Sequence, residues 1–319
     1  MTQTQQNPFP YSDSNKRYHT YEYHLRQRFG GKCAKLPLDG GFTCPNKDGT
    51  RGRGGCIYCS ARGSGDFAPE ATLSISQQIR RQKELFSRKW DVSRCIVYFQ
   101  ANTNTYAPVE VLRQRYEEAL SQEGIVGLHI ATRADCLPPD VVEYLAELAE
   151  RTALTVELGL QSSNDATAAR INRGHTFAEF CDAVARLRRA GDRIGICVHV
   201  ILGLPGEGDE QMMQTVRDVA ALEPEQVKIH LLHVLRGTAL AALYEAGEYE
   251  PLERERYIRL VANALELLPP KTVIGRLTGD GKAEDLLAPL WSLRKTTVIN
   301  DIDKLMYARD SYQGKFYQK

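Results

Sequence analysis

Short apolar runs alternate along the chain with longer segments in which apolar residues recur every three or four positions. The runs are typical of buried strands, and the longer segments are typical of helices that cover a sheet. Six strand–helix pairs in succession predict parallel strands joined by right-handed crossovers. The expected strands are 35–39, 94–100, 127–132, 155–161, 193–203 and 226–234, and the expected helices are 75–90, 108–122, 138–152, 177–191, 209–222 and a stretch from Thr238.

Polar and apolar side chains alternate within these strands. In residues 155–161, Val156, Leu158 and Leu160 share one face, and Glu157 and Gln161 share the other. If helices cover the aliphatic faces, the polar faces line an interior. The alternative is that each polar residue is a core group with its own hydrogen-bond partner, which explains one such histidine well but several such residues poorly. A closed eight-stranded barrel is filled with aliphatic layers, so the pattern predicts an α/β fold: an open, partial TIM-type (β/α)6 barrel around a polar ligand. The polar lining would include Asp39, His129, Arg133, Glu157, Lys228 and His230.

Composition agrees with a globular protein. The chain has 319 residues, 42% hydrophobic and 25% charged, which excludes disorder, collagen and a disulfide miniprotein. We expect the barrel to span residues 32–245, after a helical N-terminal extension, 1–31, and before a C-terminal α/β extension, 246–319, that closes the barrel and is a candidate for substrate binding. Since no apolar run approaches about 20 residues and the start lacks a signal pattern, we expect a cytoplasmic protein without a membrane partner.

Three cysteines share one loop after the first expected strand. Cys44, Cys56 and Cys59 have the spacing C-x11-C-x2-C, in a segment too rich in Gly, Pro, Asn and Asp for regular structure. The pair Cys56 and Cys59 alone is compatible with a redox dithiol, a zinc knuckle or an iron–sulfur site. A zinc ribbon needs a second ligand pair, and only Cys33 lies near. Three thiolates on a [4Fe–4S] cluster would leave one iron open, which indicates chemistry. The other cysteines lie singly in regular segments and read as small buried hydrophobes.

Four blocks now carry a resemblance: the cysteine loop, residues 98–108 (YFQANTNTYAP), 156–176 (VELGLQSSNDATAARINRGHT) and 199–207 (HVILGLPGE). Each lies at the carboxyl end of an expected strand. In these blocks the chain resembles radical S-adenosylmethionine (SAM) enzymes, in the branch of the elongator catalytic subunit and the oxygen-independent coproporphyrinogen oxidase. It is most similar to the short bacterial elongator-like subgroup, and the resemblance covers roughly residues 17 to 310.

The resemblance implies a site residue by residue. Cys44, Cys56 and Cys59 would ligate three irons of a [4Fe–4S] cluster, and the fourth iron would bind the amino and carboxylate groups of SAM. The remaining SAM contacts would come from Tyr58 near the adenine, from Gln100 and Asn102, and from Gln161, Arg173, His199 and Gly203. The segment QANTN replaces the family's Gly-Gly-Glu tripeptide, and Ala131 replaces a glutamate of the elongator group, so the latter contact does not transfer.

The resemblance also implies a reaction. A flavodoxin- or ferredoxin-type donor would reduce the cluster, SAM would be cleaved, and the 5′-deoxyadenosyl radical would abstract hydrogen from a substrate. Lining residues that would act on or orient the substrate are Asp39, Glu157, Lys228 and His230, with His129 and Arg133.

Elongator relatives modify the wobble uridine of tRNA, so tRNA is the expected partner and the C5 substituent of that base the expected target. After the sixth unit only about 80 residues remain, so we expect no acetyltransferase domain and not the whole carboxymethylation. Residues 1–100 carry 16 Lys and Arg against 8 Asp and Glu, which suits phosphate contact. Basic and aromatic residues also interleave near the end of the chain: Arg276, Trp291, Arg294, Lys295, Lys304, Tyr307 and Tyr312.

Two other hypotheses stay open on the sequence. One is the same cofactor chemistry on a small metabolite or porphyrin-like compound. The other is a zinc-stabilised RNA-binding module without catalysis. The first predicts that activity ignores RNA, and the second predicts a colourless protein that holds zinc.

Overall fold

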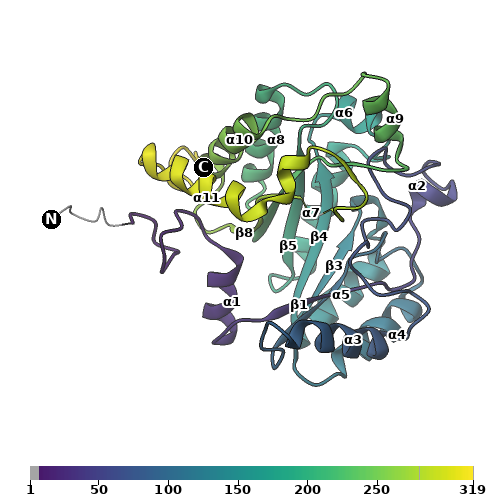
Figure 1. Ribbon diagram of the computed structural model, residues 1–319. Coiled ribbons are helices and arrows are strands. Elements are labelled where there is room, and N and C mark those ends of the chain that lie inside the picture. The colour runs from purple at the N-terminus through teal and green to yellow at the C-terminus, as the bar shows by residue number, and fades with distance from the viewer. Residues whose placement is uncertain (1–6, 280, 319) are drawn as a thin grey trace.

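A curled sheet of seven parallel strands forms the centre of the protein in the computed structural model, which describes residues 7–279 and 281–318 (Figure 1). The strand order is β1-β2-β3-β4-β5-β6-β8, so the six expected strands lie side by side in chain order. The strands are β1 Ala34–Leu38, β2 Cys95–Phe99, β3 Ile125–Thr132, β4 Ala153–Gln161, β5 Gly195–Leu202, β6 Gln226–Leu231 and β8 Val273–Arg276.

The sheet is an open half-barrel, because β1 and β8 stand at opposite ends of the strand order. This confirms the partial barrel, with one addition. β8 comes from the part expected as a C-terminal extension, and it pairs with β6 in parallel, with Gln226 opposite Val273. The expected strand 226–234 is also shorter than predicted: it ends at Leu231, and Val234–Leu235 forms β7, which pairs with β9, Leu286–Ala288.

Helices follow the strands as expected and cover the outside of the sheet (Figure 1). Two of them begin with capping boxes: Ser74 with Gln77, and Thr176 with Glu179. The helices are α1 Tyr21–Phe29, α2 Pro45–Asp48, α3 Ile75–Ser87, α4 Val109–Leu120, α5 Pro139–Arg151, α6 Asp165–Arg170, α7 Phe177–Ala190, α8 Asp209–Ala221, α9 Ala239–Glu245, α10 Arg254–Leu267 and α11 Lys295–Ala308, with 3-10 turns η1 Ala134–Cys136 and η2 Leu290–Leu293.

Helix α1 crosses the open side of the half-barrel. It begins after Thr20, which bridges to Ile274 of β8, and the backbone N–H of Ile274 donates to His19. The helix ends at Gly30, a left-handed C-cap, shortly before β1. Of the expected N-terminal extension, residues 1–6 lie outside the described part of the chain. The described part of this extension, with its contacts to β8 and its end just before β1, therefore connects the two edges of the sheet.

The hydrophobic core lies between the sheet and the outer helices. Val156, Leu158 and Leu160 of β4 are fully buried there, and they pack in one cluster with residues such as Leu145 of α5 and Phe180 of α7. Burying each such side chain stabilises the fold by about 1.5–3 kcal/mol. The polar residues of the same strands must then face the inside of the half-barrel. In the described ranges, no helix combines the length and the apolar character that crossing a bilayer requires.

Candidate functional site

The cysteine loop lies at the carboxyl end of the strands. Cys44 is the N-cap of the short helix α2, and Pro45 occupies its first turn. Cys56 and Cys59 share a turn in which the Cys59 N–H donates to the Cys56 carbonyl at 2.9 Å. All three are free thiols, and all three line one cavity. The loop therefore gathers the three cysteines that the sequence singles out.

A reciprocal pair of asparagines fastens this loop to the segment between α6 and α7. The buried Asn46 side chain donates from Nδ2 to the carbonyls of Asn172 and Arg173, at 2.5 and 2.8 Å. In return, Asn172 Nδ2 donates to the carbonyl of Gly55 at 2.7 Å. Both ends of the loop are thus tied to one rigid neighbour. Neither asparagine was identified from sequence, since nothing in the local pattern separates them from turn residues.

The cavity beneath the loop has a volume of about 250 Å³ and reaches into the interior of the half-barrel. It brings together most of the side chains that the sequence proposed for cofactor and substrate. Those that line it, besides the three cysteines, are Tyr58, Gln100, Asn102, Arg133, Glu157, Gln161, Arg173, His199, Lys228 and His230.

Asp39 and Gly203 lie outside this cavity. The Asp39 carboxylate accepts the backbone N–H of Gly41 at 2.9 Å, so it closes the turn after β1. Gly203 has a φ of +92°, which suits glycine, and its carbonyl accepts a hydrogen bond from the Tyr249 hydroxyl at 2.8 Å. Both residues lie in turns at the ends of strands. For Asp39, alternation does not distinguish this position from one in the lumen; Gly203 was proposed from the resemblance, for its backbone.

Arg173 is buried and its guanidinium is already bound by backbone. Nε and Nη2 donate to the His175 carbonyl at 3.0 and 2.6 Å, and Nη1 donates to the carbonyls of Leu160 and Ser162. Asp165 lies 3.5 Å from Nη2. The side chain that was expected to contact SAM thus has its donors bound to other partners. Here Arg173 holds the end of β4 against the segment before α7.

Left-handed backbone occurs at two of the proposed SAM contacts. Asn102 and Gln161 have φ values of +58° and +69°, uncommon for residues other than glycine. The Asn102 side-chain oxygen accepts from the Lys47 ammonium at 2.9 Å, and Gln100 Nε2 donates to the Ser64 carbonyl at 2.8 Å. The ends of β2 and β4 are therefore bent where they meet the cysteine loop.

Glu157 is the centre of a buried ionic network in the lumen. Its Oε1 lies 2.7 Å from the Lys35 ammonium and 2.6 Å from His129 Nδ1. Its Oε2 accepts from His199 Nε2 at 2.8 Å and from the Lys228 ammonium. Glu157 is only 1% exposed, so its hydrogen bonds to these partners replace the hydrogen bonds to water that burial removes. Lys35 was missed from sequence, although it alternates with Leu36 and Leu38 as the other lumen residues do.

Burial and mutual charge set the protonation of this network. Burial alone would raise the pKa of Glu157, but the charges of Lys228 and Lys35 and the imidazole hydrogen bonds hold it well below its usual range. Burial lowers the pKa of Lys35 to about 7, against the attraction of Glu157. Burial, with the nearby lysine charges, lowers the pKa of His129 to about 3 and of His199 to about 4. Both imidazoles are therefore neutral at pH 7.

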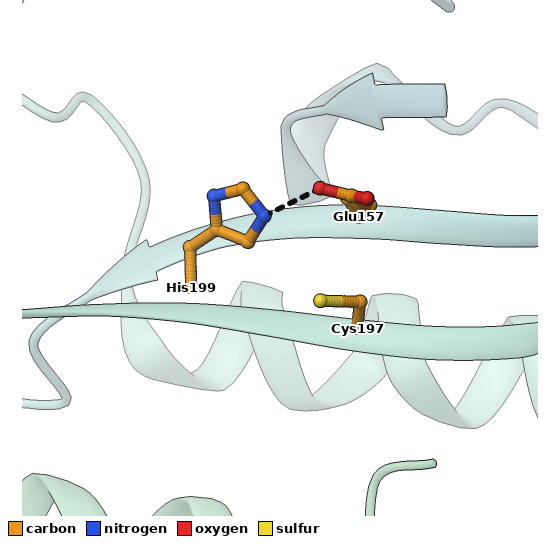
Figure 2. Close-up of side chains that lie close together, drawn as sticks. All are labelled: Glu157, Cys197 and His199. Atoms are coloured by element: carbon orange, nitrogen blue, oxygen red, sulfur yellow. Dashed lines mark hydrogen bonds and ion pairs between the residues drawn. The ribbon is translucent and has the colours of Figure 1, made fainter. Parts of the chain in front are cut away.

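Figure 2 shows the side chains of Glu157, Cys197 and His199 close together. Their potential metal-ligand atoms all lie within 4.8 Å of one another. Such a group could hold a metal ion by geometry alone. However, the ammonium groups of Lys35 and Lys228 are already bound to the same carboxylate. A cation there would meet two positive charges at close range. The arrangement fits an ion network better than a metal centre, and Cys197 stays a buried hydrophobe as expected from sequence.

Two imidazole nitrogens lining the cavity have no partner among the described residues. These are Nε2 of His230 and Nε2 of His233, both out of contact with solvent. The His199 and His230 rings lie 5.0 Å apart. Because buried polar atoms are almost always hydrogen-bonded, these two nitrogens indicate that the cavity takes a polar ligand. Together with the three thiols, this lining fits an iron–sulfur cluster with a polar nucleoside beside it.

The C-terminal aromatic residues make contacts mainly within the chain. Trp291 Nε1 donates to the Leu252 carbonyl at 3.2 Å, and the Arg17 guanidinium lies 5.1 Å from the Tyr307 ring centroid. Lys304 pairs with Asp301. Trp291 thus helps to pack this segment against the barrel, whereas Tyr307 is 57% exposed.

Residues 47–219 match the radical SAM superfamily, and residues 224–308 match the radical SAM C-terminal domain. YtqA of Bacillus subtilis, described as uncharacterized, is 51% identical over 99% of this chain and 97% of its own length. The tRNA uridine(34) acetyltransferase of Methanocaldococcus jannaschii is 26% identical over 62% of this chain and 36% of its own length. The similarity thus extends over nearly the whole chain for YtqA and over part of it for the acetyltransferase.

Among solved structures, the archaeal Elp3 of Methanocaldococcus infernus, with an N-terminal deletion, superposes with a TM-score of 0.69 at 18% identity. The match covers 88% of this chain and 64% of that chain. This likeness confirms the fold inferred from the strand pattern. The family matches confirm the resemblance to radical SAM enzymes seen in the four sequence blocks.

Proposed function

The chain belongs to the radical S-adenosylmethionine superfamily, and from this premise we propose that Cys44, Cys56 and Cys59 are the protein ligands of its [4Fe–4S] cluster. Membership makes the protein an enzyme that uses this cluster and SAM, and it excludes the zinc-stabilised module without catalysis. The observation that carries the ligand proposal is that three free thiols from one loop line a single polar cavity at the carboxyl ends of the strands. Barrel enzymes place their sites at this end.

The cavity lining supports a division of work around SAM. From the family resemblance, Tyr58 would contact the adenine, and the strand-end residues Gln161 and His199 would contact polar groups of SAM; all three line the cavity. Arg173 would act through backbone, by fixing the end of β4. When bound, the cluster and SAM supply a 5′-deoxyadenosyl radical that takes a hydrogen atom from a substrate C–H bond. A flavodoxin- or ferredoxin-type protein would provide the electron.

The Glu157 network would orient the substrate. The carboxylate fixes the Lys228 ammonium and the His199 ring in one place, so neither needs to reorganise when a ligand enters. Lys228 can then donate a hydrogen bond to a substrate oxygen, and His230 offers an unpartnered Nε2 for a second contact. Because His199 is neutral at pH 7, its Nε2–H donates to Glu157 without adding charge to the lumen.

As substrate we propose tRNA, with the C5 substituent of the wobble uridine as the target. Support comes from the partial likeness to the tRNA uridine(34) acetyltransferase and from the fold shared with archaeal Elp3. The basic first third of the chain, with net charge +8 over residues 1–100 from 16 Lys and Arg against 8 Asp and Glu, suits contact with phosphate.

Mass spectrometry of tRNA nucleosides tests the substrate. A strain without the gene should lose, or accumulate the precursor of, one C5-modified wobble uridine. The wild-type gene should restore the normal nucleoside, as should the matched control Cys181→Ala, in which the cysteine lies on α7 away from the cavity. Cys56→Ala should restore nothing. Identical nucleosides in all strains would contradict tRNA as substrate and would favour a small metabolite, while leaving the cluster proposal intact.

A further inference from the structure

A second cavity lies at the open side of the half-barrel, between the edge strands β1 and β8. Its volume is about 530 Å³, within the range of small-ligand sites, and α1 closes one side of it. It shares Phe67, Tyr98, Gln100, Lys228 and Arg276 with the cavity under the cysteine loop, so the two adjoin. The mechanism proposed above does not use this opening. We call it the seam cleft and define it by Lys32, Lys35, Phe67, Trp90, Tyr98 and Lys228.

The outer rim of the seam cleft carries exposed aromatic rings. Trp90 is 54% exposed and Phe67 is 47% exposed, although burial would favour both side chains. The Lys32 ammonium lies 5.8 Å from the centroid of the Trp90 ring. Lys32 also pairs with Glu22 at 3.2 Å, but both are more than half exposed, so this pair is weak and can exchange for another anion. An exposed ring beside a lysine suits a stacked base with its phosphate.

The inner end of the seam cleft is cationic. The ammonium groups of Lys35 and Lys228 lie 4.0 and 4.5 Å from the centroid of the Tyr98 ring, and both bind the same Glu157 carboxylate. Two lysine amino groups therefore share one carboxylate, and this end carries a net positive charge when Lys35 is protonated. An electron-rich or anionic group that enters from the seam would be attracted by this positive charge. The attraction is stronger here than in water, because a buried site has a low dielectric constant.

We propose that the seam cleft binds one nucleotide, with its base against Trp90 and Phe67 and its phosphate at Lys32. A nucleotide held there would place the neighbouring nucleotide of a chain at Tyr98 and Lys228, in the lumen. The inference rests on the proposed function in that it needs a nucleotide substrate. It goes further, because it names the route by which RNA reaches the site. A free nucleotide has the same chemistry, so the test separates the two sources.

The test measures the affinity of the cluster-loaded, SAM-bound protein for a fluorescent anticodon stem–loop RNA, with UMP as a competitor, and its affinity for UMP alone by calorimetry. Trp90→Ala should weaken RNA binding about tenfold, because it removes the ring on which one base stacks. Lys32→Glu should weaken it about as much, because it replaces a phosphate contact with a negative charge. The matched controls Phe316→Ala and Lys271→Glu, both at exposed positions outside the cleft, should stay within about twofold of wild type. Iron content and the thermal midpoint check that each variant is folded.

The outcomes separate the cleft from the proposed function. Loss in both cleft variants with unchanged controls supports the cleft, and competition by UMP adds free nucleotides to its ligands. If wild type binds the RNA and the cleft variants bind it equally well, the cleft proposal is overturned while RNA stays the substrate. If wild type binds UMP but not the RNA, and Trp90→Ala loses UMP, the cleft stands and the tRNA substrate falls. Binding of neither probe overturns both.

Discussion

At the scale of single residues, the lumen holds its charges in one connected group. Glu157 has four polar partners, and two of them are lysines. Removing one partner of such a buried pair commonly costs about 3–5 kcal/mol, because the other charge stays buried without compensation. The network therefore constrains which protonation states the lumen can adopt.

Lys35 gives this constraint a measurable pH dependence. Burial lowers its pKa from 10.5 to about 7 in the folded protein. Between these values the unfolded chain binds more protons than the folded one, so the free energy of unfolding should rise with pH in this window. We expect wild type to gain about 1 kcal/mol between pH 7 and pH 8 relative to Lys35→Met, measured by anaerobic urea unfolding of the cluster-loaded protein.

Lys271→Met is the matched control, since Lys271 is exposed and precedes the first residue of β8. It should keep the wild-type rise with pH. The same rise in Lys35→Met, or a flat wild-type profile, would show that Lys35 titrates outside this window.

Residue identities in the lumen could be inferred from sequence where a strand is long enough to show alternation. Glu157 and His199 belong to strands of nine and eight residues, and both lie where period two places them. Lys35 lies in a five-residue strand that contains a proline, so the pattern was too short to be convincing. The partners of Arg173 could not be inferred, because they are backbone carbonyls that only the folded turn brings together.

At the scale of elements, the cysteine loop depends on its asparagine clamp. Asn46 joins α2 to the segment between α6 and α7 through two carbonyls, and it is fully buried. The loop has little regular structure of its own, so these bonds must fix the positions of the thiols. The clamp is thus part of what makes the loop able to retain a cluster.

Asn46→Ala should loosen the cluster without unfolding the protein. The substitution removes two buried hydrogen bonds and leaves the Asn172 carbonyl unpaired, at a cost of about 1–3 kcal/mol if it stays dry, while the Arg173 carbonyl keeps the Arg133 guanidinium as a donor. We expect several-fold faster loss of iron to a chelator, followed by absorbance under anaerobic conditions. Asn263→Ala, which removes an exposed contact to Arg309, is the control. Equal rates in both variants and wild type would show that the clamp does not hold the loop.

The elements differ in how well the sequence predicts them. Helices with strong apolar periodicity and capping boxes, such as α3 and α7, were located within a few residues. β8 was missed because it has four residues and includes Gly275, which weakens any strand signal. The split of 226–234 was also missed, since β7 exists only through its pairing with β9 far along the chain.

At the scale of the whole molecule, the open sheet joins two sites. One end of the interior meets the cysteine loop, and the open side between β1 and β8 meets the seam cleft, with the Glu157 network between them. A closed barrel would have no such side opening. On the proposals above, cofactor and substrate would approach the same lumen from different directions, one from the cysteine loop and the other from the seam cleft.

The central claim is that Cys44, Cys56 and Cys59 hold a cluster that binds SAM. The most direct measurement is formation of 5′-deoxyadenosine from SAM by anaerobically purified, reduced protein, together with its iron and sulfide content. We predict about four irons and four sulfides per chain for wild type and for Cys181→Ala, with SAM cleavage in both. Cys44→Ala, Cys56→Ala and Cys59→Ala should each abolish cleavage. Cleavage retained in all three variants, or a wild-type protein with zinc in place of iron, would contradict the account.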